Sequence, residues 1–466
     1  MNRPPRNTER LFCTPEQHVT AVKSFAQALA ATTGIVRLAK RTSNLFRSRS
    51  KASHKLNASL FANTIAVDPK AGTADVQGMC TYEDFTDACL VYGYMPAVVP
   101  ELKTITVGGA VSGIGIEATS FRHGLVHETV EEIEVLCGDG KVRICRADNE
   151  YADLFRALPN SYGTLGYILR LRCRIIPVKR SVRATYTRFS DRSAFLAAIE
   201  QECESGQGSA DNDFVEGVCF DPNTFVLVTG VHCDEIPDTT NKGPEPYYKN
   251  LLSKSSIILS TRDWIWRWDP DWFWCSRFYG MENPVLRFMF GPWMLRSERY
   301  WKIMAWYRKH RIESKVQYLR KLVGLPVSLR EPMIQDVEIP LARCGEFLDF
   351  YEQHINIRPL WICPLRPLVD SERWTLYSMH PGAVHLNFGF WESVPTNKEN
   401  APDHFNRMLE QEVTRLDGRK SLYSTSYFPV DEFWKIYNGD VCHTLKERYD
   451  PAARFPDLYQ KTVQRR

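Results

Sequence analysis

The chain has 466 residues, a formal net charge of +4 and 24% charged residues. This length suffices for two or three domains with a large core, whereas the balanced charge gives no support for a nucleic-acid-binding protein, which needs a concentrated basic face. The thirteen cysteines form no C-x-x-C pair and show no Cys/His spacing of a zinc site, so we expect reduced thiols and no bound metal.

Segments that address a protein to a membrane are not visible. No apolar run approaches the length of about 18 residues that spans a bilayer. The first ten residues include basic side chains but lack the apolar core of a signal peptide. We therefore expect no transmembrane segment and a cytoplasmic location, and peripheral contact with a membrane stays open.

The first predicted element is a helix that begins after Thr14, has Pro15 in its first turn and ends before Gly34. A short strand follows at residues 35–38, and another is predicted at residues 63–67. Between these strands lies a basic, hydroxyl-rich stretch, residues 40–50. It is either a solvated surface or a loop that faces phosphate. Under the second interpretation its candidate contacts are Arg41, Ser43 and Asn44.

A further helix is predicted after Thr81, and the most distinctive segment of the chain follows it at residues 104–120. Four glycines fall within eight residues there: Gly108, Gly109, Gly113 and Gly115. Glycine permits positive φ and a close approach to a ligand, and successive amides in such a loop hold phosphate. We therefore predict that this loop binds a phosphate-bearing cofactor, with plain turn glycines as the alternative.

Residues 113–118 match the dinucleotide fingerprint G-x-G-x-x-A in form only. That motif counts when it follows a strand and opens a helix. Residues 119–124 carry no helical periodicity, so a Rossmann fold is rejected.

The remaining elements up to residue 180 predict one α+β domain. Residues 131–136 and 141–145 flank a Gly-Asp-Gly turn and predict a hairpin. A short helix is expected from Asp153. Gly163 and Gly166 precede a strand at residues 167–176, and Pro177 closes the unit.

From Ser181 the pattern changes to longer alternating strands, predicted at residues 213–220, 224–231, 361–364 and 384–391. Residues 431–459 read as helical. We predict a substrate domain over residues 181–430 with an antiparallel sheet, followed by a C-terminal helical segment, residues 431–466.

Eight of the twelve tryptophans fall between Trp264 and Trp306. Strand alternation would place Trp264, Trp266 and Trp268 on one face. This segment, which also holds Trp272 and Trp274, is either core or the wall of an apolar pocket or a lip that touches lipid. In the last case Arg262, Arg267 and Arg277 would suit anionic headgroups.

Several of these stretches resemble known flavoproteins. Residues 107–120, 134–140 and 163–166 look like the FAD domain of vanillyl-alcohol-oxidase-type proteins. Residues 212–217, 228–231, 283–291, 361–364 and 432–434 resemble the delta-24-sterol reductase (24-dehydrocholesterol reductase, Diminuto) family. The resemblance runs from about residue 63 to the end. It implies an α+β fold in which a PCMH-type FAD-binding domain of two subdomains, residues 1–180, precedes an α+β substrate (cap) domain.

The resemblance also implies an activity. An FAD-dependent oxidoreductase of this family, acting on CH–CH groups, reduces an isolated C=C bond of a sterol-like or other bulky apolar substrate with hydride from NADPH, passed through flavin N5. One alternative is an FAD oxidase or dehydrogenase of an alcohol or sugar acid on the same fold. Another is a non-catalytic flavin- or lipid-binding protein. His54 and His123 invite covalent attachment of the flavin, but the resemblance implies that FAD binds non-covalently.

Site residues follow from the glycine segment and the resemblance together. The proton donor is not identified by sequence: Tyr423 and Glu216 rank ahead of Asp336, since each would act as a general acid if burial retained its proton. The predicted cofactor contacts, besides the three candidates of residues 40–50, are Thr106, Val107, Gly108, Gly109, Ser112, Gly113, Gly115, Ile116, Glu117, Ser120, Gly124, Gly163, Thr164 and Gly166.

Overall fold

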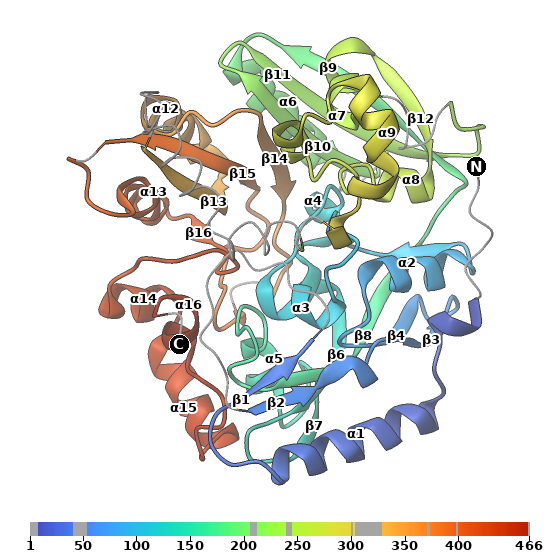
Figure 1. Cartoon of the computed structure of the whole chain (residues 1–466), viewed down its shortest axis with the longest axis vertical. Helices are drawn as coiled ribbons and strands as arrows, with labels where there is room; N and C mark the ends of the chain where they lie inside the picture. The colour runs from blue at the N-terminus through green and yellow to red at the C-terminus, as the bar shows by residue number, and fades with distance from the viewer. Residues whose placement is uncertain are drawn as a thin grey trace.

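The computed structural model describes residues 8–40, 54–205, 212–238, 245–299, 302, 329–370, 373–397 and 399–464. Arg41, Ser43 and Asn44 lie outside the described residues. Two antiparallel sheets with flanking helices form the molecule, the first in its lower half in Figure 1 and the second in its upper half. The predicted α+β class is confirmed, and the chain passes from the first sheet to the second between Pro177 and Ser181.

The first sheet is built around its longest strand, β8 (Tyr167–Pro177). In β8 the buried residues Leu169, Leu171 and Cys173 alternate with half-buried residues. The predicted hairpin is confirmed, with Gly140 at a φ of 83° in its turn. The strand order is β3 (Thr64–Asp68), β4 (Thr73–Gln77), β8 (Tyr167–Pro177), β6 (Val130–Leu136) and β7 (Val142–Cys145), and β5 (Tyr94–Pro96) also pairs with β8.

Helices at the first sheet start at the residues that the sequence indicates. Thr14 caps α1 (Pro15–Ala30) through a reciprocal capping box with Gln17, and Thr81 caps α2 (Tyr82–Leu90). α1 packs Phe25 and Leu29 against the small parallel pair β1 (Val36–Ala39) and β2 (His54–Asn57). α5 (Ala152–Ala157) confirms the predicted short helix.

The second sheet has one face covered by α6 (Arg192–Ser205), α12 (Cys344–His354) and α13 (His404–Arg415), whose apolar side chains form a core with it. Its inner strands β10 (Phe214–Asp221) and β14 (Leu360–Leu365) are almost wholly buried, in keeping with their apolar composition. The strand order is β12 (Ser256–Ser260), β9 (Ser181–Phe189), β11 (Thr224–Cys233), β10 (Phe214–Asp221), β14 (Leu360–Leu365), β15 (His385–Thr396), β13 (Leu329–Pro340) and β16 (Arg419–Lys420).

The C-terminal helices α14 (Val430–Ile436), α15 (Gly439–Tyr449) and α16 (Leu458–Thr462) return to the first domain, where Figure 1 shows them in red beside the blue and teal elements. Tyr449 donates to Asp153 at 2.9 Å, and Arg454 donates to the carbonyl oxygen of Thr32 at 2.8 Å. The end of the chain therefore closes the first domain rather than extending the second.

The tryptophan-rich segment is not a strand, and this prediction was wrong. Over residues 261–274 it consists of α8 (Thr261–Ile265) and irregular turns, and Trp264, Trp266, Trp268, Trp272 and Trp274 are all buried. Burial excludes the lipid-facing lip for these five side chains, whereas Trp293, further along the same segment, is 53% exposed. These five side chains lie in the chain between α7 (Tyr247–Ser253) and the helix α9 (Pro284–Met294). Among the described residues, no helix is long and apolar enough to cross a bilayer.

Candidate functional site

The glycine segment is helical where a loop was expected. Residues of this segment form α3 (Val107–Gly113) and, further on, α4 (Ser120–His123). The Gly108 amide donates to the Gly78 carbonyl oxygen at 2.9 Å, and a Cβ built on Gly108 would lie 2.8 Å from that oxygen. The Val107 amide donates to the carbonyl oxygen of Cys80. These two amides are therefore engaged within the protein, and Gly108 serves the close approach of two backbones.

Positive φ, which was expected of the glycines, falls instead on Ile114, at 61°. Gly115 and Gly166 sit where a Cβ would collide with Val126 and Val135, respectively. Close packing thus accounts for these glycines, while the assignment of the segment to a cofactor stays a prediction.

Tyr162 joins the two predicted cofactor motifs. Its amide donates to the Ser112 carbonyl oxygen at 2.8 Å and its hydroxyl donates to the Gly113 carbonyl oxygen at 2.9 Å. The turn that follows, with Gly163 at a φ of 73°, is therefore held against α3. Lys461 donates to the Tyr162 carbonyl oxygen at 2.5 Å, so the C-terminal segment supports the same turn.

The predicted cofactor contacts at this junction differ in how far they are buried. Among the predicted contacts, Gly109, Ser112, Ile116 and Gly163 keep some exposed surface, and none of them projects a long side chain. Thr106 precedes α3 without making a side-chain cap bond to it, so its hydroxyl is not used there. The other predicted contacts within the described residues are buried: Thr106, Val107, Gly108, Gly113, Gly115, Glu117, Ser120, Gly124, Thr164 and Gly166.

Two of the three predicted acids, Tyr423 and Asp336, meet at this junction. Asp336 lies on β13, shares a hydrogen bond with the Tyr423 hydroxyl, and accepts from Asn387 Nδ2 at 3.3 Å. Loss of solvation raises the pKa of Asp336 to about 6 and raises the pKa of Tyr423 above its usual range. Ser421 donates to the Gly113 carbonyl oxygen at 3.4 Å, which ties this acid pair to the glycine segment.

A second carboxyl stands behind this pair and was not predicted. Glu338 lies two residues after Asp336 on the same face of β13 and accepts from the hydroxyl of Tyr377. Burial raises the pKa of Glu338 to about 8, and the Asp336 charge adds to the rise. The alternation of Asp336 and Glu338 with Val337 and Ile339 at the end of β13 was the signal in the sequence that would have found it.

The third predicted acid, Glu216, belongs to a different cluster. Its carboxylate accepts from Arg267 Nε at 2.8 Å and from the indoles of Trp268 and Trp361, both at 2.9 Å, and it is wholly buried. All three donors are N–H groups, so the Glu216 carboxylate acts as a hydrogen-bond acceptor in every one of these contacts.

Arg267 also donates to Glu117 at 2.7 Å, so it joins the second sheet to the segment after α3. Burial raises the pKa of Glu117, while the Arg267 charge opposes the rise. The Glu117 side chain is therefore engaged by Arg267 within the described residues. The predicted cofactor contact of Glu117 would have to use its backbone. The two histidines considered for covalent attachment differ: His54 is exposed, and burial lowers the pKa of His123 to about 4.

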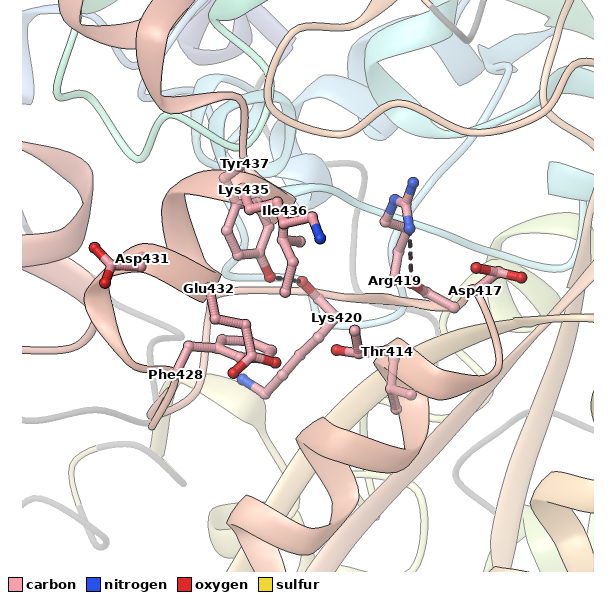
Figure 2. Close-up of a pocket in the computed structure, with 12 residues that line it drawn as sticks. Thr414, Asp417, Arg419, Lys420, Phe428, Asp431, Glu432, Lys435, Ile436 and Tyr437 are labelled. Carbon is pink, nitrogen blue, oxygen red and sulfur yellow. Dashed lines mark hydrogen bonds between the residues drawn. The ribbon is translucent and has the colours of Figure 1, made fainter.

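A cavity of about 610 Å³ opens between α13 and α14 (Figure 2). Figure 2 shows charged side chains of both signs around it, and the Tyr437 hydroxyl donates to the Lys420 carbonyl oxygen at 3.0 Å in its wall. None of the predicted cofactor or catalytic residues lines this cavity. Its lining residues are Val413, Thr414, Asp417, Gly418, Arg419, Lys420, Phe428, Asp431, Glu432, Lys435, Ile436 and Tyr437.

Comparison with known proteins extends these observations. A family model described as an FAD binding domain matches residues 11–146. The Delta(24)-sterol reductase of Macaca fascicularis is 28% identical over 433 residues, which cover 88% of this chain and 78% of the relative. That of Arabidopsis thaliana is 25% identical over 439 residues, covering 86% and 75%. Cytokinin dehydrogenase 7 of Oryza sativa subsp. japonica is 33% identical over 154 residues, covering 32% and 29%.

Proposed function

We propose that this homologue of the Delta(24)-sterol reductases, an oxidoreductase with an FAD-binding domain, reduces an isolated C=C bond of a sterol-like or other bulky apolar substrate. FAD is its non-covalent cofactor and NADPH its hydride donor. The observation that carries the proposal is the position of Tyr423 and Asp336, an acid pair of the second domain, at the glycine segment of the first. The similarity to the sterol reductases extends through both domains, which supports the same assignment.

Reduction of an isolated alkene requires one hydride and one proton. Bound FAD would supply the hydride, and the protein must supply the proton. We assign the proton to the Tyr423 hydroxyl. Trp391 Nε1 donates to the phenol oxygen of Tyr423 at 3.0 Å, so it would stabilise the negative charge that develops there when the proton leaves. Asp336 orients the hydroxyl group.

Glu216 is a less suitable proton source, because three N–H groups hold its carboxylate. We assign it a positioning role: through Trp361 it fixes an aromatic side chain of β14, and through Arg267 it fixes Glu117 beside α4. The proposed FAD contacts are the partly exposed backbone at Gly109, Ser112 and Gly163 and the hydroxyl of Thr106.

Aromatic side chains surround the proposed donor and favour an apolar substrate. Phe273 stacks on Trp391 with ring centroids 4.3 Å apart, and it lies 5.2 Å from Trp361. Gly389 makes room for this arrangement, because a Cβ there would lie 2.5 Å from the Asp336 carboxylate and 2.8 Å from Trp391. The rings of Phe273, Trp391 and Trp361 thus favour an apolar substrate over a sugar acid.

The purified protein tests the proposal directly. We expect the oxidised flavin spectrum, release of the flavin on acid precipitation, bleaching by NADPH without oxygen, and recovery of the spectrum on addition of a sterol with a C24 double bond. Bleaching by an alcohol but not by NADPH would indicate the oxidase or dehydrogenase. A folded preparation that takes up no added FAD would overturn the proposal.

A further inference from the structure

The helix α9 presents its apolar side chains to solvent. The exposed fractions are 85% for Phe288, 62% for Met289, 63% for Val285 and 53% for Trp293, and Leu286 and Phe290 are also exposed. These side chains share one broad face of the helix, since successive residues turn by about 100°. A surface helix of a soluble protein normally turns this face inward, so α9 lies in the inverted orientation.

A buried ion pair holds α9 in this orientation. Arg287 faces the protein and donates to both carboxylate oxygens of Asp271, at 2.6 Å and 2.9 Å, and both side chains are almost fully buried. Ser276 donates to the same carboxylate at 2.6 Å, and Asn283 caps the helix start. The polar side of α9 is therefore fixed inward by bidentate geometry, and its rotation is not free.

The charges around this face suit a phospholipid surface. Residues 283–299 contain one acidic residue, Glu298, and three arginines, of which Arg287 is paired inside. Arg296 and Arg299 follow the end of the helix, and the guanidinium of Arg299 lies 4.6 Å from the Trp293 ring centroid. An aromatic ring beside a cation at the rim of an apolar face matches the interfacial layer of a bilayer, where acyl chains meet headgroups.

The same segment leads to the proposed proton donor. Asp271, which anchors α9, precedes Phe273 by two residues, and Phe273 stacks on Trp391, the hydrogen-bond donor to Tyr423. An apolar face and the aromatic wall of the candidate site are thus joined by one short stretch of chain. Figure 1 shows α9 in yellow next to α8, in the upper half of the molecule, where the second sheet lies.

We propose that α9 docks the protein on a phospholipid bilayer by inserting its exposed apolar face among the headgroups, without spanning the membrane. This goes beyond the proposed reductase activity, because binding to lipid requires neither substrate nor cofactor turnover. The binding partner that we propose for α9 is lipid and not a second copy of the chain.

Flotation with vesicles tests the proposal. The full-length protein is mixed with vesicles of phosphatidylcholine, with or without phosphatidylserine, and the floated fraction is measured. We expect binding to both, and stronger and more salt-sensitive binding to the anionic vesicles because of Arg296 and Arg299. The double variant Phe288→Ser/Met289→Ser should lower the vesicle partition coefficient by at least about 10-fold, since two large side chains lose their burial in lipid.

The matched control is Ile236→Ser/Val369→Ser, which removes two apolar side chains that are 75% and 86% exposed outside α9. It should float like the unchanged protein, and thermal melting should be the same for all three proteins because every changed side chain is exposed. Failure of the unchanged protein to float, or equal flotation of the α9 variant, overturns the proposal. So does light scattering that shows a dimer broken by the α9 variant without any vesicle binding.

Discussion

The Trp391 indole donates a hydrogen bond to the phenol oxygen of Tyr423 at 3.0 Å. Because this bond uses a lone pair of the phenol oxygen, the hydroxyl proton can serve the hydrogen bond that Tyr423 shares with Asp336. Trp391 belongs to β15 and Asp336 to β13, two strands in direct register, whereas Tyr423 comes from the segment after β16. Two strands of the second sheet thus hold the Tyr423 hydroxyl in place through Trp391 and Asp336.

Removal of this hydroxyl should slow the proton step alone. Tyr423→Phe is expected to lower kcat by about 100-fold or more, the usual contribution of a general acid, while bleaching of the flavin by NADPH keeps its rate. Stopped-flow measurement of the two half-reactions checks this. The control is Tyr427→Phe, four residues further on, whose hydroxyl bonds Asp403 instead. Equal turnover of Tyr423→Phe and the control would remove Tyr423 from the mechanism.

The buried Arg267 should matter greatly for stability. Arg267→Leu leaves Glu117 and Glu216 buried without their cation, and the expected cost is about 3–5 kcal/mol in the free energy of unfolding. Arg262→Leu is the control, since that side chain is 41% exposed and pairs with Asp87 and Glu83; its cost should stay near ~1 kcal/mol or below. Urea unfolding measures both, and similar midpoints would contradict the prediction.

The carboxyl of Glu338 should make stability depend on pH. Its pKa is raised in the folded protein from 4.5 to about 8, so the folded state holds the proton more tightly than the unfolded state. The stabilisation is fully present below pH 4.5 and is lost as the pH rises through about 8. Glu338→Gln cannot titrate, so its unfolding midpoint should fall less over this range than that of the unchanged protein. An unchanged slope would show that Glu338 is ionised in the folded state throughout.

Close packing at Gly108 should not tolerate a side chain. Gly108→Ala would place a Cβ 2.8 Å from the Gly78 carbonyl oxygen, so α3 must shift. We expect a loss of about 1–3 kcal/mol in stability and a lower FAD content after purification. Gly345→Ala, in the first turn of α12, meets nothing within 4 Å and should be neutral or stabilising by up to about 1 kcal/mol. Calorimetry and the flavin-to-protein absorbance ratio compare the two variants.

Local patterns of the sequence predicted many elements correctly. The caps at Thr14 and Thr81 and the Gly-Asp-Gly hairpin lie where expected, because capping and turn formation depend on residues three or four positions apart. The same local reasoning failed for the tryptophan-rich segment. Its alternation suggested a strand, but the neighbours that decide the matter, among them Glu117 and Glu216, are far away in the chain.

The candidate site was predicted in part for the same reason. The glycine segment and the resemblance pointed to residues 106–124 and to Tyr423 and Asp336, but not to how they meet. The ion pair of Arg267 with Glu117 joins residues 150 positions apart, and the bond of Tyr377 to Glu338 joins residues 39 positions apart. Such contacts depend on the tertiary arrangement of distant segments and not on local spacing.

The amino-acid sequence alone therefore determined the helix starts at Thr14 and Thr81, the α+β class and the likeness to flavin-dependent sterol reductases, since these depend on short-range spacing and on residue type. The tertiary structure decided that α9 turns its apolar face outward, that Glu216 receives three N–H donors and that Tyr423 stands beside Asp336. The physical reason is that burial and charge pairing depend on which segments, distant in the sequence, pack against each other. A local sequence pattern does not specify those packing partners.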